Sequence, residues 1–170
     1  YVPSNATLTL AGDFEVDDMK GLVDKWFGSF PKLPKPERSV VETPALAKTV
    51  RRVEEDAFAK LEQVQWVWHG PKNLGEDSFD LDVGMRVLGA NGWGRLYKRL
   101  VLGEQLCTYA TAYSFGQQHT GQIALVAQLK PGVDRTRVEA IFQEELDKLA
   151  AEPISDAELE RFDSVGAAFL

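Results

Sequence analysis

A short run near the middle of the chain holds residue types that enzymes use for proton transfer, nucleophilic attack and oxyanion stabilisation. The run "GRLYKRLVLGEQLCTYATAY", residues 94–113, contains Tyr97, Arg99, Glu104, Cys107 and Tyr109. A cysteine nucleophile needs a nearby base or cation that lowers the pKa of its thiol. The neighbours of Cys107 in sequence are apolar or hydroxyl residues. We therefore predict a partly buried, inert thiol at the entry to a strand.

The two histidines cannot form either of the common zinc-peptidase motifs. His-Glu-x-x-His and His-x-x-Glu-His place both histidines on one helical face, whereas His69 and His119 stand fifty residues apart. We expect His69 at the end of a strand and His119 in a hairpin turn. A lone histidine is more often structural or solvated than a metal ligand. The single cysteine excludes a multi-thiolate zinc site, so we predict no metal ligands and no cofactor in this chain.

The glycines of "GANGWG", residues 89–94, suggest a phosphate-binding loop only at first sight. No Gly-Lys-Ser/Thr follows, and the segment comes after a predicted helix rather than a strand. A turn between two helices, where glycine permits unusual dihedral angles and close packing, is the better interpretation. A Gly-x-Ser-x-Gly nucleophile signature is also missing. The residues alone thus give no self-contained catalytic constellation.

Composition limits the class of protein. The chain has 170 residues, 44% of them apolar and 26% charged, which predicts a single globular domain over residues 1–170. Its formal net charge is −7. The stretch from Asp134 to Asp163 contains ten acidic and four basic residues. This imbalance argues against a nucleic-acid partner. No run is apolar enough to predict a membrane span. Because the chain starts at Tyr1 and stops inside an apolar-periodic stretch, we expect a fragment of a longer protein.

Periodicity predicts the elements that must position these residues. Alternation predicts strands over 5–13, 48–58, 61–69, 108–115 and 121–130, with Val64, Trp66 and Trp68 on one face against helices. Helical spacing predicts helices over 16–30 and 76–88, the second with a stripe of Phe79, Val83 and Val87. The proline-rich "PKLPKPERSVVETP", residues 31–44, reads as an extended connector.

Further helices follow from the same reasoning. A short helical piece has Leu96 and Leu100 toward the core and leaves Tyr97, Arg99 and Glu104 on or near the surface. The amphipathic helix over 134–151 aligns Val138, Ile141, Phe142, Leu146 and Leu149, and Ser155 to Glu158 has capping-box spacing before a last helix. The order β-α-β-β-α-β-β-α-α predicts an α+β layered sandwich, with a mixed or antiparallel sheet and helices on one face.

Four motifs in a fixed order resemble a known family. "YVPSNATLTLAGDFEVDDMKGLVDKWFGSFPKLPKP", "GRLYKRLV", "LKPGVD" with its long helix, and "PISDAELER" are similar to the second domain of a half-unit in the insulinase-like M16 zinc metallopeptidases. The resemblance covers essentially the whole chain. It implies two halves that close around a peptide chamber, with zinc held by His-x-x-Glu-His in a domain that lies outside the matched region.

The resemblance also implies a place within such a protein. Domains that complement the active site from the opposite half carry an Arg and a Tyr at positions where this chain has Val101 and Thr108. A one-residue shift offers Tyr109 but still no arginine. The "RLYKRLV" form is similar to the second domain of the zinc-bearing half, which lacks that pair.

A weaker implication concerns peptide anchoring. In some long family members this domain holds the N-terminal part of a substrate by adding it to a strand edge. The matching positions are Gly89 and Asn91 in the turn and Tyr109, Thr111 and Tyr113 on the strand. Most residue types differ, so only backbone-mediated binding is expected, and ordinary strand aromatics are the favoured interpretation of the two tyrosines.

The expected function is therefore a non-catalytic, chamber-forming domain of a zinc-dependent peptidase that hydrolyses peptide bonds by metal-activated water. Its partners would be the other domains of the same protein and the peptide substrates. The alternative is a catalytically inactive scaffold subunit, similar to the core proteins of respiratory complexes. The resemblance leaves the compartment open between the bacterial periplasm or cell envelope and the cytoplasm.

Overall fold

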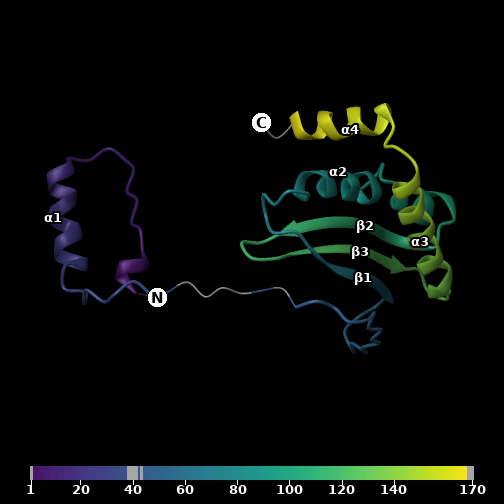
Figure 1. Ribbon diagram of the computed structural model, residues 1–170, viewed down its shortest axis with the longest axis horizontal. Helices are drawn as coiled ribbons and strands as arrows, with labels where there is room; N and C mark the ends of the chain where they lie inside the picture. Colours follow the sequence, from purple (N-terminus) through teal and green to yellow (C-terminus); the bar gives the residue numbers. More distant parts are fainter. Residues whose placement is uncertain (1, 38–41, 43, 168–170) are drawn as a thin grey trace. The chain divides into compact units, whose positions relative to one another are not determined.

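A computed structural model of the chain describes residues 2–37, 42 and 44–167. The chain divides into two compact units, Tyr1–Val41 and Glu42–Leu170, which are taken here one at a time (Figure 1). The expectation of a single domain over residues 1–170 stays a prediction. The predicted connector over 31–44 has no regular structure where it is described, and residues 38–41 and 43 lie outside the described part.

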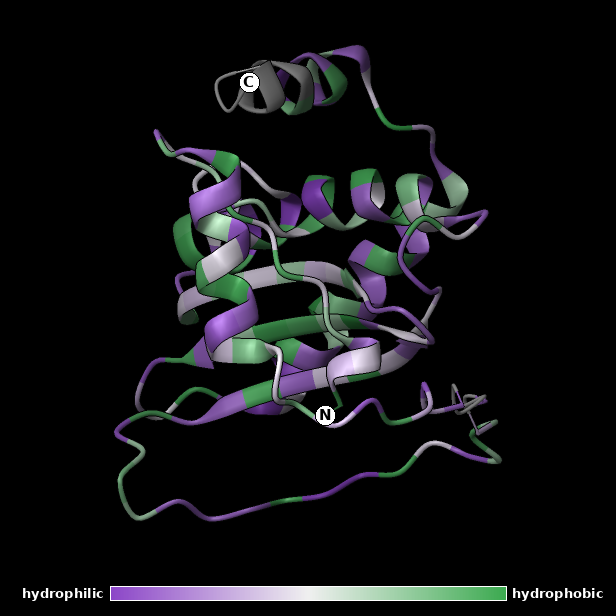
Figure 2. Cartoon of the chain, turned by 90° about the vertical axis from the view of Figure 1, so that its left-hand side faces the viewer, coloured by the Kyte–Doolittle hydropathy of each residue, from purple (hydrophilic) through white to green (hydrophobic). Residues whose placement is uncertain are grey.

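The first unit contains a short 3-10 helix, Pro3–Asn5 (η1), and one α-helix, Val16–Phe27 (α1). The predicted helix over 16–30 is confirmed and ends three residues early, at the Gly28 cap. Figure 2 shows hydrophobic and hydrophilic bands along this unit, and no side chain of α1 is buried. The predicted strand over 5–13 is wrong: these residues form no ladder. Alternation predicts a strand's face, but a strand also needs a neighbour to bond, and the described residues of this unit supply none.

The second unit is built on a three-stranded antiparallel sheet. Its strands are Gln63–Gly70 (β1), Cys107–Gly116 (β2) and Gly121–Leu129 (β3), in the spatial order β1-β3-β2. The strands predicted over 61–69, 108–115 and 121–130 are thus confirmed. The strand predicted over 48–58 is wrong. Arg51 forms a bidentate ion pair with Glu139, and the Asp56 side chain accepts a hydrogen bond from the N–H of Phe58. These side-chain interactions hold the stretch, which pairs with no neighbouring strand among the described residues.

Helices pack against one face of this sheet. Those that contact the sheet are Ser78–Gly89 (α2), the π-helix Tyr97–Gly103 (η2) and Arg135–Ala151 (α3), while Asp156–Ala167 (α4) packs on α2. In α2 the buried stripe is Met85, Val87 and Leu88, while Phe79 is 70% exposed. Phe79 was therefore wrongly expected in the stripe: it is the second residue of α2, whose buried residues all lie between Gly84 and Gly89. The predicted α+β class, with helices on one face of an antiparallel sheet, is confirmed.

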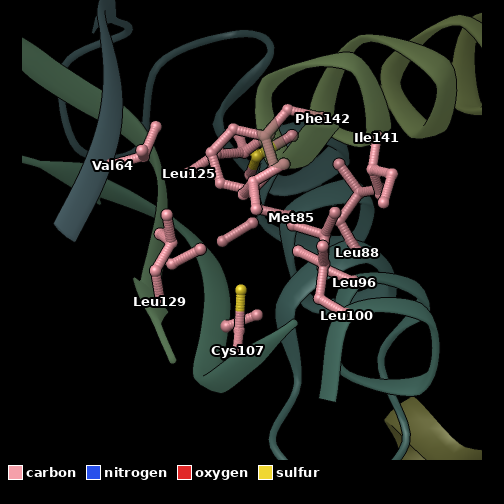
Figure 3. Close-up of a cluster of buried hydrophobic side chains, with 14 residues drawn as sticks. Val64, Met85, Leu88, Leu96, Leu100, Cys107, Leu125, Leu129, Ile141 and Phe142 are labelled. Carbon is pink, nitrogen blue, oxygen red and sulfur yellow. The ribbon is translucent and has the colours of Figure 1, made fainter. Parts of the chain in front are cut away.

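The hydrophobic core lies between the sheet and these helices (Figure 3). Leu96, Leu100, Val138, Ile141 and Phe142 are fully buried, as predicted, and Leu146 and Leu149 pack against the cluster. The ring of Phe142 meets Trp66 edge-on at 5.6 Å between centroids. Val64 and Trp66 face the helices as expected, while Trp68, nearer the strand end, keeps 37% exposure.

The register divides the sheet into two faces because side chains alternate along each strand. The covered face meets the core. The opposite face, called the open face below, has four rows of three residues: Gln63, Gln128 and Tyr109; Gln65, Val126 and Thr111; Val67, Ala124 and Tyr113; His69, Gln122 and Phe115. Seven of the twelve are exposed, while Ala124 and Val126 in the central strand are buried by their neighbours.

Candidate functional site

The run over 94–113 contains no activated nucleophile. Cys107 is the first residue of β2, its side chain is fully buried, and burial raises the pKa of its thiol to about 11. A thiol with so high a pKa stays protonated near neutral pH, and the thiolate is the reactive form. The prediction of an inert, packed cysteine at the entry to a strand is confirmed.

Arg99 and Glu104 belong to an ionic network that ties η2 to α3. Arg99 Nη1 donates to Glu145 Oε1 at 2.9 Å, and Arg99 Nη2 bonds Glu144. Glu104 accepts from Arg137 Nη2 at 2.6 Å, and this bond holds the pKa of Glu104 below its usual range. Each charge is met by an opposite one, so the network positions two helices and leaves no group free for catalysis.

A second ion pair holds α4. Arg95 Nε and Nη2 donate to the two carboxylate oxygens of Glu158 at 2.8 and 3.0 Å. The N–H and hydroxyl of Ser155 also donate to Glu158, which forms the glutamate half of the predicted capping box, while the Glu158 N–H bonds the Ser155 carbonyl and not its hydroxyl. The Arg95 hydrogen bond is the main cause that lowers the pKa of Glu158 to about 2. The pair is a structural clamp.

The two histidines lie where they were predicted. His69 is the next-to-last residue of β1, and His119 lies in the β2–β3 turn. Within residues 2–37, 42 and 44–167, no three His, Cys, Asp or Glu side chains gather as metal ligands would.

The turn after α2 depends on its glycines for geometry. Gly92 has a φ of +84°, and a Cβ on Gly94 would lie 2.5 Å from the Ala90 nitrogen. Both positions therefore exclude side chains, the first by conformation and the second by contact. The predicted helix–helix turn is confirmed.

The two positions that mark the missing Arg/Tyr pair serve different structural roles. Val101 lies in η2 and packs against the hydrophobic core. Thr108 lies at a bulge in β2, where its hydroxyl donates to Gln128 Oε1 at 2.9 Å. Neither side chain could extend a cation or a phenol toward another domain.

The five candidate anchoring residues lie on β2, which is an edge strand of the sheet, and at the adjoining end of α2. Thr111 Oγ1 donates to the carbonyl of Gly89 at 2.9 Å, and Asn91 follows in the exposed turn. Tyr109 and Tyr113 share the open face and are 43% and 38% exposed. A Cβ on Gly89 would lie 1.7 Å from the Ala112 nitrogen, so the end of α2 touches the β2 backbone here. Whether these residues hold a peptide stays a prediction.

A groove of about 790 Å³ lies along β1 and α3, beside residues 49–62. Arg51 and Glu139, which form an ion pair, line it together with Trp66 and Trp68. Among the described residues, no Ser, Cys or His lines the groove, and one of its carboxylates, Glu139, is paired with Arg51.

Sequence reasoning missed the open face as a surface. None of its twelve residues is Asp, Glu, Lys or Arg, although 26% of the chain is charged. The missing signal is the strand register, because only pairing shows that these positions form one surface. A trace of it is visible in the sequence, since Gln63 and Gln65, and likewise Gln122 and Gln128, are an even number of positions apart within their strands.

The second unit is thus an α+β unit with helices on one face of its sheet, and among the residues that the structure describes we find no catalytic or metal-binding constellation. A sequence profile of the peptidase M16 inactive domain matches residues 1–162. The chain belongs to the M16 peptidase inactive domain family, which confirms the predicted family and the non-catalytic character of the domain. No match is found among curated protein sequences. No helix in the described part has the length and apolar character needed to cross a membrane.

Solved structures support this assignment. A protease from Helicobacter pylori is 22% identical, with a TM-score of 0.70 over 92% of this chain and 38% of that one. The inactive peptidase domain of a protein assigned as a zinc protease in Bordetella parapertussis is 29% identical, with a TM-score of 0.55 over 62% and 57%. An M16 inactive domain from Pseudomonas fluorescens is 17% identical, with a TM-score of 0.63 over 94% and 38%. The Helicobacter and Pseudomonas structures support the fold alone. The chain spans between 38% and 57% of the length of these relatives.

Proposed function

We propose that this chain is a non-catalytic domain that forms part of the wall of a peptide chamber in a zinc-dependent metallopeptidase. The parent protein would hydrolyse peptide bonds by metal-activated water, with zinc held in another domain. The observation that carries the proposal is the match to the M16 inactive domain over residues 1–162.

We further propose that the domain follows a zinc-bearing domain in the same half. The positions of the Arg/Tyr pair support this placement, since Val101 is taken up by the core and Thr108 by Gln128. The peptide-anchoring role of Gly89, Asn91, Tyr109, Thr111 and Tyr113 belongs to the same proposal. A peptide there would have to share the edge of β2 with the end of α2.

The test compares the chain with its parent protein. We expect the chain, incubated with Zn²⁺ and a quenched-fluorescence peptide library, to give no turnover, and the parent to give turnover that a chelator removes. Metal-dependent cleavage by the chain itself would refute the proposal. A parent that binds no zinc and lacks His-x-x-Glu-His would favour the inactive scaffold instead.

A further inference from the structure

The last helix, α4, is attached to the second unit in a different way from α3. In α3, Ile141 and Phe142 are fully buried in the hydrophobic core. Of the α4 side chains at 156–162, none is buried and none belongs to that core. Glu158 and Phe162 are half-buried, and the other five are exposed. These residues of α4 therefore add nothing to the core, although the helix packs on α2 (Figure 1).

The two half-buried side chains of α4 both contact arginines. The ion pair between Arg95 and Glu158 has two hydrogen bonds, and its side chains are 16% and 18% exposed. The guanidinium carbon of Arg86, in the last turn of α2, lies 5.6 Å from the centroid of the Phe162 ring, which is a cation–π contact. Both contacts depend on the positive charge of a guanidinium group. We call the two contacts together the arginine latch.

The segment between α3 and α4 allows the two helices to move separately. Helix α3 ends at Ala151, and residues 152–155 form neither helix nor strand. Proline has no backbone N–H and disfavours a helix interior, so Pro153 separates α3 from α4. Within 152–155, Ile154 is half-buried and the other three residues are exposed. Rotation about these few residues would move α4 away from α2 without changing α3.

The arginine latch is weak compared with the core. A two-bonded ion pair favours docking by a factor of roughly ten or more, and a cation–π contact at a half-exposed site by a factor of about three. Burial of each large core side chain favours folding by a factor of roughly ten to a hundred, and the core combines many of them. Detachment also leaves Arg86 its ion pair with Asp82 at 3.3 Å and opens Arg95 to water. Neither charge is then buried without a partner.

We propose that α4 is a releasable helix, held on α2 by the arginine latch, that detaches about residues 152–155 while the sheet, α2 and α3 stay folded. The second unit thus has a docked and a released state, and the charges of Arg95 and Glu158 set the balance between them. This conformational device goes beyond the proposed function and does not depend on it.

Hydrogen exchange of the intact chain, followed by mass spectrometry, tests the release. We expect the amides of α4 to exchange faster than those of α3 and β3, through an opening that leaves the core folded. Arg95→Met removes the main contact of the latch but keeps the α4 sequence and the bonds from Ser155 to Glu158. It is expected to speed exchange of the α4 amides about tenfold.

Two control variants separate release from other openings. Arg51→Met removes the arginine of another two-bonded pair, the one with Glu139 of α3, and is expected to leave α4 exchange unchanged. Ile141→Val shortens a fully buried side chain and is expected to speed exchange of the core amides about two- to tenfold. It should leave α4 exchange unchanged, because the released state keeps the same core.

Two results would overturn the proposal. If Ile141→Val speeds exchange in α4 as much as in the core, α4 opens only when the whole unit unfolds. If Arg95→Met leaves α4 exchange at its original rate, the arginine latch does not hold the helix.

Discussion

The two faces of the sheet in the second unit are formed by the same strands but differ in burial and in residue type. The covered face contributes Val64, Leu125 and Leu129 to a core in which these side chains are almost fully removed from water. The open face is neutral, rich in amides and aromatics, and largely exposed. The comparison separates residues whose apolar character follows from burial from residues that are uncharged without being buried.

The largest expected effect tests burial directly. Phe142→Ala removes a fully buried ring that packs on Trp66 and is expected to lower the free energy of unfolding by about 3–5 kcal/mol. Phe115→Ala makes the same change at a ring of the open face that is 57% exposed, where less than about 1 kcal/mol is expected. Urea unfolding followed by tryptophan fluorescence measures both. Similar losses would mean that something covers both faces.

The next effect concerns the charges on the covered side. Arg99→Met leaves Glu145, whose side chain is 6% exposed, with only Lys148 at 3.3 Å, so a loss of about 3 kcal/mol is expected. Arg135→Met breaks a pair of half-exposed side chains 3.6 Å apart and is expected to cost about 0.5 kcal/mol or less. Urea titrations of both variants provide the comparison. A negligible loss of unfolding free energy for Arg99→Met would show that the ionic network does not stabilise the position of α3.

A smaller effect follows from pH. The pKa of Glu158 falls from its ordinary value of 4.5 to about 2, so between these values the folded state binds fewer protons than the unfolded state. The stabilisation is thus complete above pH 4.5 and lost as pH falls toward 2. It amounts to about 1.5–3 kcal/mol, typical of hydrogen bonds to charged groups.

The measurement is stability against pH for the unchanged chain and for Glu158→Gln. The variant is expected to lose this contribution at neutral pH and to show a flatter decline below pH 4.5. The open face has no carboxylate and contributes nothing to that decline. Parallel curves for the two proteins would show that Arg95 does not hold Glu158 as described.

The smallest effect concerns the start of α3. Asp134 Oδ1 accepts from the N–H of Thr136 at 2.9 Å and caps the helix, so Asp134→Ala is expected to cost about 1 kcal/mol. Asp134→Asn keeps an acceptor oxygen and is expected to cost only a few tenths of that, by urea unfolding. Equal losses for both would show that charge at the helix terminus, and not the cap bond, matters here.

The sequence predicted most of the second unit and less of the first. The apolar run that became β3 and the stripe of α3 through Val138 and Phe142 are both recognisable by period, because burial on one side leaves that trace. The strands predicted over 5–13 and 48–58 failed because alternation carries no information on a partner strand. For the second stretch, the bond from Arg51 to Glu139 links residues 88 apart in sequence. The open face was hidden for the same reason, since its rows combine residues from three strands.

The close approach of Gly89 to β2 has a consequence for folding. Only a hydrogen atom fits between the end of α2 and the Ala112 backbone, and the Thr111 hydroxyl fastens the Gly89 carbonyl beside it. If the end of α2 moved away from the β2 backbone, water would enter between them. The helix is therefore either docked on the strand or detached from it. We therefore expect the amides of α2 and the middle of β2 to exchange hydrogen with similar opening free energies, as one cooperative unit.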